Sequence, residues 1–252
     1  MESSAEELVG YRFAKSRGSY EQAASTQRYM AEALVKMLPA QAPGSVLEIG
    51  CGTGLLTRAL LRVCSPSVLH LNDISSGFES GFRSLDHIPG LRCLCGDAEH
   101  YPWPCRYDWV VSSSVFQWFA DFSAFVDRIV RYQNRDGVLA FGTFGPENMR
   151  EIRAVEGVGL DYLSKDELQS SLERCYHTLE CREEVLQLEF ASPYQVLNHL
   201  RQTGVNALSR QVWTPSRLRR FEESYVRLFS KGDKVTLTYH PIFYVGRKKD
   251  DF

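Results

Sequence analysis

The sequence lacks the features of a membrane-spanning, secreted or zinc-binding protein. No stretch approaches the roughly 18 consecutive apolar residues of a transmembrane helix, and the acidic N-terminus has no signal-peptide hydrophobic segment. The 7 cysteines are odd in number and form no C-x-x-C pair, which disfavours a zinc site or a disulfide framework. We expect Cys93 and Cys95 to share one face of a strand and to pack in the core. A reduced, cytoplasmic chain of 252 residues with one full hydrophobic core is therefore predicted.

Net charge is also small, at −2, but it is unevenly distributed. Residues 201–249 contain eleven Lys or Arg and only three acids. Such a run usually forms a solvated helix face, and it equally suits a docking face for an acidic partner. Charge alone leaves both interpretations open. Nucleic acid is not favoured as a partner, because no basic motif interleaved with aromatic residues is present.

The most informative segment is a glycine-rich turn near residue 50. A short apolar run, Val46–Ile49, reads as a buried strand, and Leu55–Leu61 has the spacing of an amphipathic helix. Between them lies a G-x-G-x-G turn formed by Gly50, Gly52 and Gly54. A strand, a glycine turn and a helix form the opening unit of a nucleotide-binding α/β sheet, although such turns also serve to pack a strand against a helix.

The spacing of these glycines separates two classes of cofactor. A dinucleotide site has the spacing G-x-G-x-x-G, so a nicotinamide-dependent oxidoreductase is disfavoured. An acid, Glu48, lies at the strand end, where an anion would repel phosphate and suit a cationic ligand such as S-adenosylmethionine. The motif resembles the first motif of class I S-adenosylmethionine-dependent methyltransferases.

Two further acids follow predicted strands. Asp73 ends the strand Ser67–Asp73, 23 residues after Gly50, at the place where a carboxylate grips a ribose diol. Asp97 follows the third strand, and the resemblance implies that it accepts a hydrogen bond from the adenine amino group. Either acid alone would more often be a helix cap or a turn residue. Three acids at the carboxyl ends of three successive strands favour a cofactor site.

The predicted fold is a doubly wound, seven-stranded, mostly parallel sheet with an antiparallel last strand, in a single methyltransferase domain. We expect an N-terminal helical cap over residues 1–40 and a cofactor-binding core over 44–191, with Glu184–Ala191 as the sixth strand. Two helices, Pro193–Thr203 and Pro215–Phe229, would form a lid inserted at 192–231. The last strand would lie within residues 234–248.

Motifs outside the glycine turn resemble the malonyl-acyl carrier protein O-methyltransferases of biotin synthesis. The matching segments are Tyr11–Tyr20 with Gln27, Phe116–Trp118, Thr143–Arg153 and Gly204–Leu208. The sequence departs from the family at Ala23, where a His is common, at Ser113, where Asn is common, and at Asn134–Gly137. The missing His argues against a general base at that place.

The resemblance implies methyl transfer from S-adenosylmethionine to the free carboxylate of a malonyl thioester on acyl carrier protein. A carboxylate is already ionised at neutral pH, so the enzyme mainly aligns the reacting groups and excludes water. We expect Arg150 to hold the carboxylate, with Arg153 as the substitute, and Tyr20 to donate a hydrogen bond. The alternative interpretations are that Arg150 is an exposed helix residue and that Tyr20 packs against the core. Two rival functions stay open: methylation of a free small carboxylic acid, and a non-catalytic module that binds S-adenosylmethionine.

The remaining expectations concern individual residues and partners. Residues expected to bind the cofactor are Gln27, Glu48, Gly50, Cys51, Gly52, Gly54, Leu55, Asp73, Ile74, Asp97, Ala98, Ser112, Ser113 and Phe116. Residues expected to dock the acidic carrier protein are Arg201, Arg210, Arg217, Arg219 and Arg220. Phe116 and Trp118 should build the pocket wall, whereas His100, His177 and His240 should be structural. We expect a monomer that holds no metal and binds neither nucleic acid nor membrane.

Overall fold

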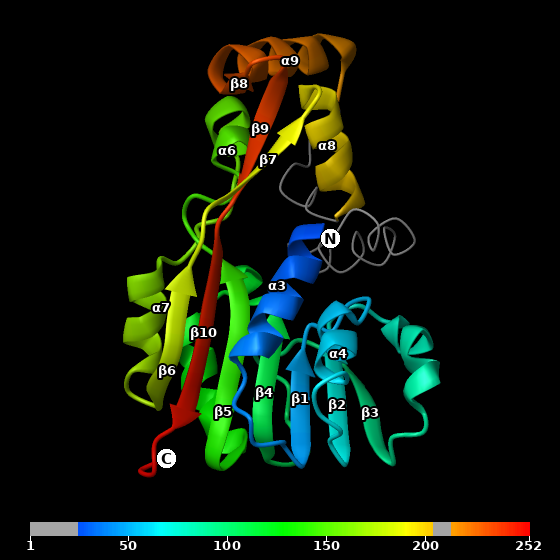
Figure 1. Ribbon diagram of the computed structural model, residues 1–252, viewed down its shortest axis with the longest axis vertical. Helices are drawn as coiled ribbons and strands as arrows, with labels where there is room; N and C mark the ends of the chain where they lie inside the picture. The colour runs from blue at the N-terminus through cyan, green and yellow to red at the C-terminus, as the bar shows by residue number, and fades with distance from the viewer. Residues whose placement is uncertain (1–24, 204–212) are drawn as a thin grey trace, which may run out of the picture. The chain divides into compact units, whose positions relative to one another are not determined.

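The computed structural model describes residues 25–203 and 213–252, which form two compact units (Figure 1). The core unit comprises residues 26–143, 163–183 and 242–252. The accessory unit comprises residue 25 and the described residues within 144–162 and 184–241. Tyr20, Arg210, the motif Tyr11–Tyr20 and the motif Gly204–Leu208 lie outside the described residues.

The core unit is built on a seven-stranded sheet with the order β3-β2-β1-β4-β5-β10-β6. The first five strands are parallel where their pairings are defined, and β10 runs antiparallel to β6. The central strands are buried on both faces, as parallel sheets require; in β1 the side chains of Val46, Leu47 and Ile49 are fully buried. The predicted fold class is confirmed. The strands are β1 (Ser45–Ile49), β2 (Val68–Asp73), β3 (Gly90–Cys95), β4 (Tyr107–Ser113), β5 (Gln133–Phe144), β6 (Tyr176–Glu183) and β10 (Pro241–Lys248).

Helices cover both faces of this sheet (Figure 1). Side chains alternate across a strand, and on β5 Phe141 points into the cluster built by α5 and α7. Its neighbour Gly142 lies on the opposite face, where Met30 of α3 approaches it. The helices of the core unit are α3 (Ser25–Met37), α4 (Leu55–Leu60), α5 (Phe122–Ile129) and α7 (Lys165–Leu172), with the short 3-10 helices η1 (Phe78–Leu85), η2 (Phe116–Trp118) and η3 (Val130–Tyr132).

The accessory unit contains a three-stranded antiparallel sheet with the order β7-β9-β8. The two helices predicted for the lid are present, and each begins with a hydroxyl cap followed by proline, with Ser192 and Thr214 as the caps. Glu151 is buried in α6 and accepts hydrogen bonds from the N–H (2.9 Å) and the hydroxyl (2.6 Å) of Thr238 in β9. The elements are α6 (Arg150–Glu156), β7 (Leu186–Phe190), α8 (Pro193–Gln202), α9 (Pro215–Phe229), β8 (Ser230–Lys231) and β9 (Lys234–Tyr239).

The strand partners differ from the prediction at two places. The sixth strand of the large sheet is Tyr176–Glu183, whereas Leu186–Phe190 pairs with β9 in the small sheet. The predicted last strand is two strands that separate at His240, whose N–H donates to Asn148 Oδ1 (3.3 Å) and whose carbonyl accepts from Gly145 N (2.8 Å). No strand had been predicted over Tyr176–Glu183. An alternating pattern indicates a strand without identifying its partner, which explains why Leu186–Phe190 was expected in the large sheet.

The cysteine prediction is also partly wrong. β3 is the edge strand of the large sheet, so Cys95 is exposed and Cys93 is only half-buried. All seven cysteines are free thiols. Along the described ranges, no helix combines the length and the apolar character that a membrane span needs. The described residues also contain no cluster of three or more His, Cys, Asp or Glu suited to a metal ion.

Candidate cofactor-binding site

The glycine turn connects β1 to α4 as predicted. Gly50, Gly52 and Gly54 all have positive φ, at 67°, 52° and 84°. A Cβ atom at Gly50 would lie 2.2 Å from the side chain of Val115, so this glycine is needed for packing. A Cβ atom at Gly52 would meet no described atom within 4 Å. Gly52 therefore presents bare backbone to open space, where a ligand can approach it.

Asp73 ties this turn to the end of β2. Its Oδ2 atom accepts a hydrogen bond from Gly52 N (2.8 Å), and its Oδ1 atom accepts one from Ser75 N (2.9 Å). Each carboxylate oxygen has a second lone pair, so Asp73 keeps acceptor capacity for a ribose hydroxyl. The Cys51 N–H donates to the carbonyl of Asn72 (2.9 Å), and burial raises the pKa of the Cys51 thiol. The next residue, Ile74, is 43% exposed and offers an apolar surface beside the turn.

Glu48 is buried below the turn and is not the simple anion that the sequence suggested. Its side chain is 1% exposed, and its Oε2 atom accepts a hydrogen bond from the hydroxyl of Thr57 (2.6 Å). Burial raises the pKa of Glu48 to about 8, so the group is mostly protonated at neutral pH. A cationic ligand nearby would favour the ionised form. Glu48 therefore supplies the negative charge expected from the sequence only when a cationic ligand is bound.

The third predicted acid, Asp97, lies in the loop after β3. Its Oδ1 atom accepts from Glu99 N (2.9 Å), and its Oδ2 atom lies 2.6 Å from Nδ1 of His100. Its side chain is 36% exposed, whereas the neighbouring Ala98 is buried. Asp97 is thus an oriented acceptor that solvent or a ligand can reach.

Two predicted residues at the end of β4 face the protein interior instead. The hydroxyl of Ser112 is buried and donates to the carbonyl of Ile49 (2.9 Å), which ties β4 to β1. Phe116 is 4% exposed, and its ring centroid lies 5.0 to 5.2 Å from those of Phe125 and Phe141. The structure therefore places Phe116 in the hydrophobic core, not in the pocket wall that we expected.

Three buried polar atoms, on α3, in the glycine turn and at the end of β4, have no hydrogen-bond partner among the described residues. They are Gln27 Oε1 on α3, Thr53 Oγ1 in the turn and Ser113 Oγ at the end of β4. Met30, one helical turn after Gln27, accepts a hydrogen bond from Ser114 Oγ at its sulfur (3.5 Å), which brings α3 to the end of β4. Leaving a buried polar group unpaired costs about 1 to 3 kcal/mol, so these atoms are expected to bind a ligand or water. They fit a polar cofactor at this edge of the sheet.

Sequence reasoning had included Gln27 and Ser113 but missed Thr53. The position of Thr53 between Gly52 and Gly54, inside the glycine motif, could have identified it as a candidate. Leu55, which we also expected at the site, is half-buried and opens α4 directly after the turn. The core unit therefore gathers the turn, Asp73, Asp97 and the three unpaired polar atoms at the carboxyl ends of β1 to β4.

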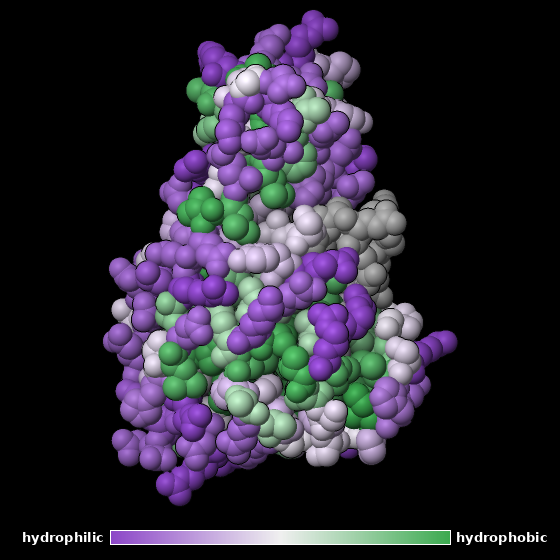
Figure 2. All heavy atoms as spheres, viewed as in Figure 1, coloured by the Kyte–Doolittle hydropathy of each residue, from purple (hydrophilic) through white to green (hydrophobic). Residues whose placement is uncertain are grey.

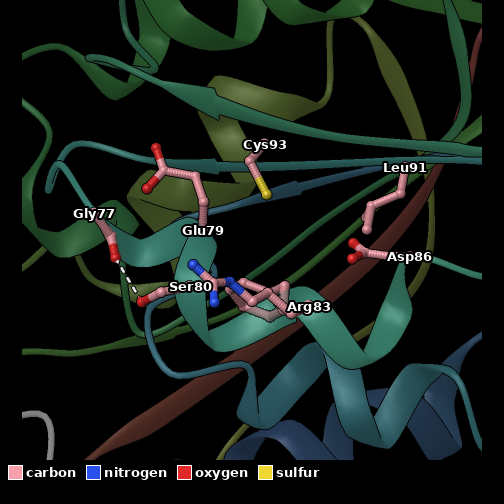
Figure 3. A pocket seen from close by; sticks show the side chains of 8 residues that line it. Gly77, Glu79, Ser80, Arg83, Asp86, Leu91 and Cys93 are labelled. Atoms are coloured by element: carbon pink, nitrogen blue, oxygen red, sulfur yellow. Dashed lines mark hydrogen bonds between the residues drawn. The ribbon is translucent and has the colours of Figure 1, made fainter.

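A cavity of about 450 Å³ lies elsewhere in the core unit, between η1 and β3 (Figure 3). Glu79, Ser80 and Arg83 extend into it from η1, and Cys93 reaches it from the edge strand. None of the residues predicted to bind the cofactor lines this cavity. Phe82, which also lines the cavity, lies against Gly54 of the glycine turn.

The predicted substrate residues belong to the accessory unit or are not described. Arg150 begins α6, is 48% exposed and pairs through Nη1 with Glu147 Oε2 (3.0 Å). Arg153 donates to the carbonyl of Pro146 (2.6 Å) and stacks on Tyr162, so it serves the local structure. Tyr20 lies outside the described residues.

The basic residues predicted for docking divide into two groups. Arg217 pairs with Glu156 and lies 4.6 Å from the ring centroid of Trp213, and its side chain is only 15% exposed. It therefore supports the accessory unit and is not available to a partner. Arg219 and Arg220 are exposed on α9, and Arg201 is exposed on α8, where it donates to Asn198 Oδ1 (3.0 Å).

Comparison with known proteins identifies the relatives of this chain. A methyltransferase-domain family matches residues 47–141. A malonyl-[acyl-carrier protein] O-methyltransferase of Bacteroides fragilis (strain 638R) is 41% identical over 247 residues, and the chain spans 50% of its length. A protein of the same name from Bacteroides thetaiotaomicron is 37% identical over 255 residues, which cover 96% of this chain and 98% of the relative.

Solved structures add the fold. The N-methyltransferase NodS of Bradyrhizobium japonicum, in complex with S-adenosyl-L-homocysteine, matches with a TM-score of 0.53 at 14% identity. The match covers 87% of this chain and 86% of NodS. The family and the enzyme class predicted from sequence are confirmed, and so is the cofactor class. The chain belongs to the malonyl-[acyl-carrier protein] O-methyltransferases, within the class I methyltransferases that use S-adenosylmethionine.

Proposed function

We propose that this protein transfers the methyl group of S-adenosylmethionine to the free carboxylate of a malonyl thioester on acyl carrier protein. The supporting observation is 37% identity over nearly the full length of a relative that carries this name. The product would be a methyl ester that hides one charge, so that an apolar fatty-acid synthase site can elongate it on the route to pimelate and biotin.

The core unit would hold the cofactor at its glycine turn. Asp73 would accept the ribose hydroxyls, Asp97 the adenine amino group, and Gln27 would contact the amino-acid end. S-adenosylmethionine supplies an electrophilic methyl group on a sulfonium. Its positive charge would favour the ionised form of Glu48, whose burial otherwise keeps it protonated. The buried unpaired atoms Thr53 Oγ1 and Ser113 Oγ are further candidates for ligand contacts.

The accessory unit would contribute the cation that holds the substrate carboxylate. Arg150 is half exposed and pairs with the half-exposed Glu147 and, through Nε, with the buried Glu151 (3.9 Å). A substrate carboxylate could replace Glu147 and form two parallel hydrogen bonds with the guanidinium. No base is required, because the malonyl carboxylate is ionised at neutral pH. Tyr20 stays a candidate donor.

The exposed face of α9 would accept the acidic carrier protein. Phe221 and Tyr225 bury one side of this helix, and Arg219, Arg220 and Arg227 are exposed with Glu223 as the acid among them. Hydrophilic residues dominate the visible surface of this part of the accessory unit (Figure 2). Complementary charge mainly accelerates association and selects the partner. We add Arg227 to the docking set and remove Arg217.

Three further assignments belong to this proposal: the location, the oligomeric state and the role of α8 and α9. The free thiols of all seven cysteines support a reduced, cytoplasmic location. We propose that the enzyme acts as a monomer and that α8 and α9 serve as a lid.

Mass spectrometry of malonyl-carrier protein incubated with the enzyme and S-adenosylmethionine tests this function, with malonyl-CoA and free dicarboxylic acids in parallel. Gain of one methyl group on the carrier-bound malonate, faster than on the CoA thioester, is the expected result. Methylation of a free acid alone would replace the proposed substrate. Cofactor binding by calorimetry without transfer to any carboxylate would favour a binding module.

A further inference from the structure

The loop that carries Asp97 is held in place from two directions. Arg128 of α5 donates through Nη1 to the carbonyl of Tyr101 (2.6 Å) and through Nη2 to that of Ala98 (2.7 Å). Glu99 accepts hydrogen bonds from the backbone N–H groups of Ala120 (3.0 Å) and Asp121 (2.9 Å). These four contacts fix the backbone of residues 98–101 to the start and the body of α5. None of these four contacts involves the Asp97 carboxylate, so they do not orient it.

His100 sets the orientation of the Asp97 carboxylate from the solvent side. Its Nδ1 atom lies 2.6 Å from Asp97 Oδ2, while Oδ1 is held by the N–H of Glu99. An ionised carboxylate only accepts hydrogen bonds, so the imidazole must carry a hydrogen at Nδ1. The hydrogen bond and the charge of Asp97 raise the pKa of His100, with Glu99 acting in the same direction and Arg128 against it. The His100 side chain is 85% exposed, so its part in packing is small.

We propose that His100 is a positioning residue that holds the Asp97 carboxylate for the exocyclic amine of adenine and so makes the enzyme prefer a 6-aminopurine to a 6-oxopurine cofactor. This inference rests on the proposed function, in which Asp97 faces that amine. Adenine donates a hydrogen bond from its 6-amino group, whereas hypoxanthine presents an oxygen there, and a carboxylate repels it. Discrimination of this kind depends on an acceptor that cannot turn away.

The size of the effect follows from the freedom that the carboxylate regains. Without His100, Oδ2 loses its hydrogen bond and the carboxylate can rotate toward solvent. Immobilising one such side chain on binding weakens the complex by roughly three- to tenfold. We therefore expect His100→Ala to reduce the preference for adenine over hypoxanthine by about that factor.

Calorimetry with S-adenosyl-L-homocysteine and S-inosyl-L-homocysteine tests the proposal on the full chain. The amide nitrogen of Asn can take the place of Nδ1, so His100→Asn should keep most of the wild-type preference, whereas His100→Ala should lose it. Asp97→Asn is the reference for complete loss of the carboxylate. Thermal unfolding of the two His100 variants should match the wild type, because the His100 side chain is 85% exposed.

Two outcomes would overturn the assignment. An unchanged preference in His100→Ala, beside a lost preference in Asp97→Asn, would show that Asp97 needs no help from His100. Equal loss in His100→Asn and His100→Ala would show that the imidazole acts by something other than an Nδ1 donor. These results do not depend on the methyl acceptor, so failure to methylate malonyl-carrier protein would overturn the proposed function and leave this test intact.

Discussion

Replacing Glu48 by Gln should make the protein more stable at alkaline pH and leave it nearly unchanged at pH 5. Glu48 is 1% exposed, and burial raises its pKa from 4.5 to about 8. Between pH 4.5 and about pH 8, Glu48 of the folded protein retains a proton that the unfolded chain has released. The free energy of unfolding therefore falls as pH rises through this window. Gln has nearly the same shape, can still accept the hydrogen bond from Thr57 and does not ionise.

The expected magnitude comes from the two pKa values. At about 1.4 kcal/mol per pKa unit, the move from 4.5 to about 8 corresponds to at most about 5 kcal/mol. Urea unfolding of the wild type and Glu48→Gln at pH 5, 6.5, 8 and 9 would measure it. The stability gap between the two proteins should open across this range and level off above pH 8.

A surface carboxylate provides the matched control. Ser164 is the N-cap of α7, and its N–H and hydroxyl donate to Glu167 Oε2, which lowers the pKa of Glu167. Its contribution is present above its ordinary pKa of 4.5 and is lost only as pH falls below that value. The gap between the wild type and Glu167→Gln should thus stay constant from pH 5 to 9. A constant gap for Glu48→Gln as well would refute the reasoning from burial.

Two further predictions use matched pairs of variants. Gly50→Ala should lower the free energy of unfolding by about 2 to 4 kcal/mol, because its Cβ would overlap Val115 at a positive φ. Gly52→Ala should cost only about 1 kcal/mol but weaken cofactor binding, and equal effects on stability in urea unfolding would contradict this assignment. Charge reversal at Arg219 and Arg220 should raise KM for malonyl-carrier protein at low salt and leave KM for malonyl-CoA unchanged. Reversal of Arg217 should instead lower the melting temperature, because it would break the pair with Glu156; unchanged kinetics after the double reversal would remove α9 from the docking face.

Local features were predictable because neighbouring residues alone decide them. The glycine turn requires positive φ at Gly50 and Gly52, which few other residues tolerate. The starts of α8 and α9 follow from a hydroxyl cap and a proline at the first turn. The positions of Asp73 and Asp97 were predictable because an acid at the end of a strand, or just after it, lies at the carboxyl edge of a parallel sheet.

Other features depended on neighbours distant in the chain. Ser112 lies at the predicted edge of the sheet, but its hydroxyl donates to the carbonyl of Ile49. The ring of Phe116 packs against Phe125 and Phe141. Sequence spacing carries no information about such contacts. His100 was expected to be structural, and only its distance to Asp97 suggests a role.

By itself, the sequence determined the strand, turn and helix of the glycine motif, the starts of α8 and α9, and the chemistry available at the ends of the first strands. These depend on backbone preferences, apolar periodicity and residue type, which act over a few neighbouring positions. Tertiary structure decided which strand pairs with which, placing Leu186–Phe190 in the small sheet and Tyr176–Glu183 in the large one. It also decided the charge state of Glu48 and the ion pair of Arg217 with Glu156, which makes Arg217 unavailable for docking. Burial and pairing arise only when distant segments meet.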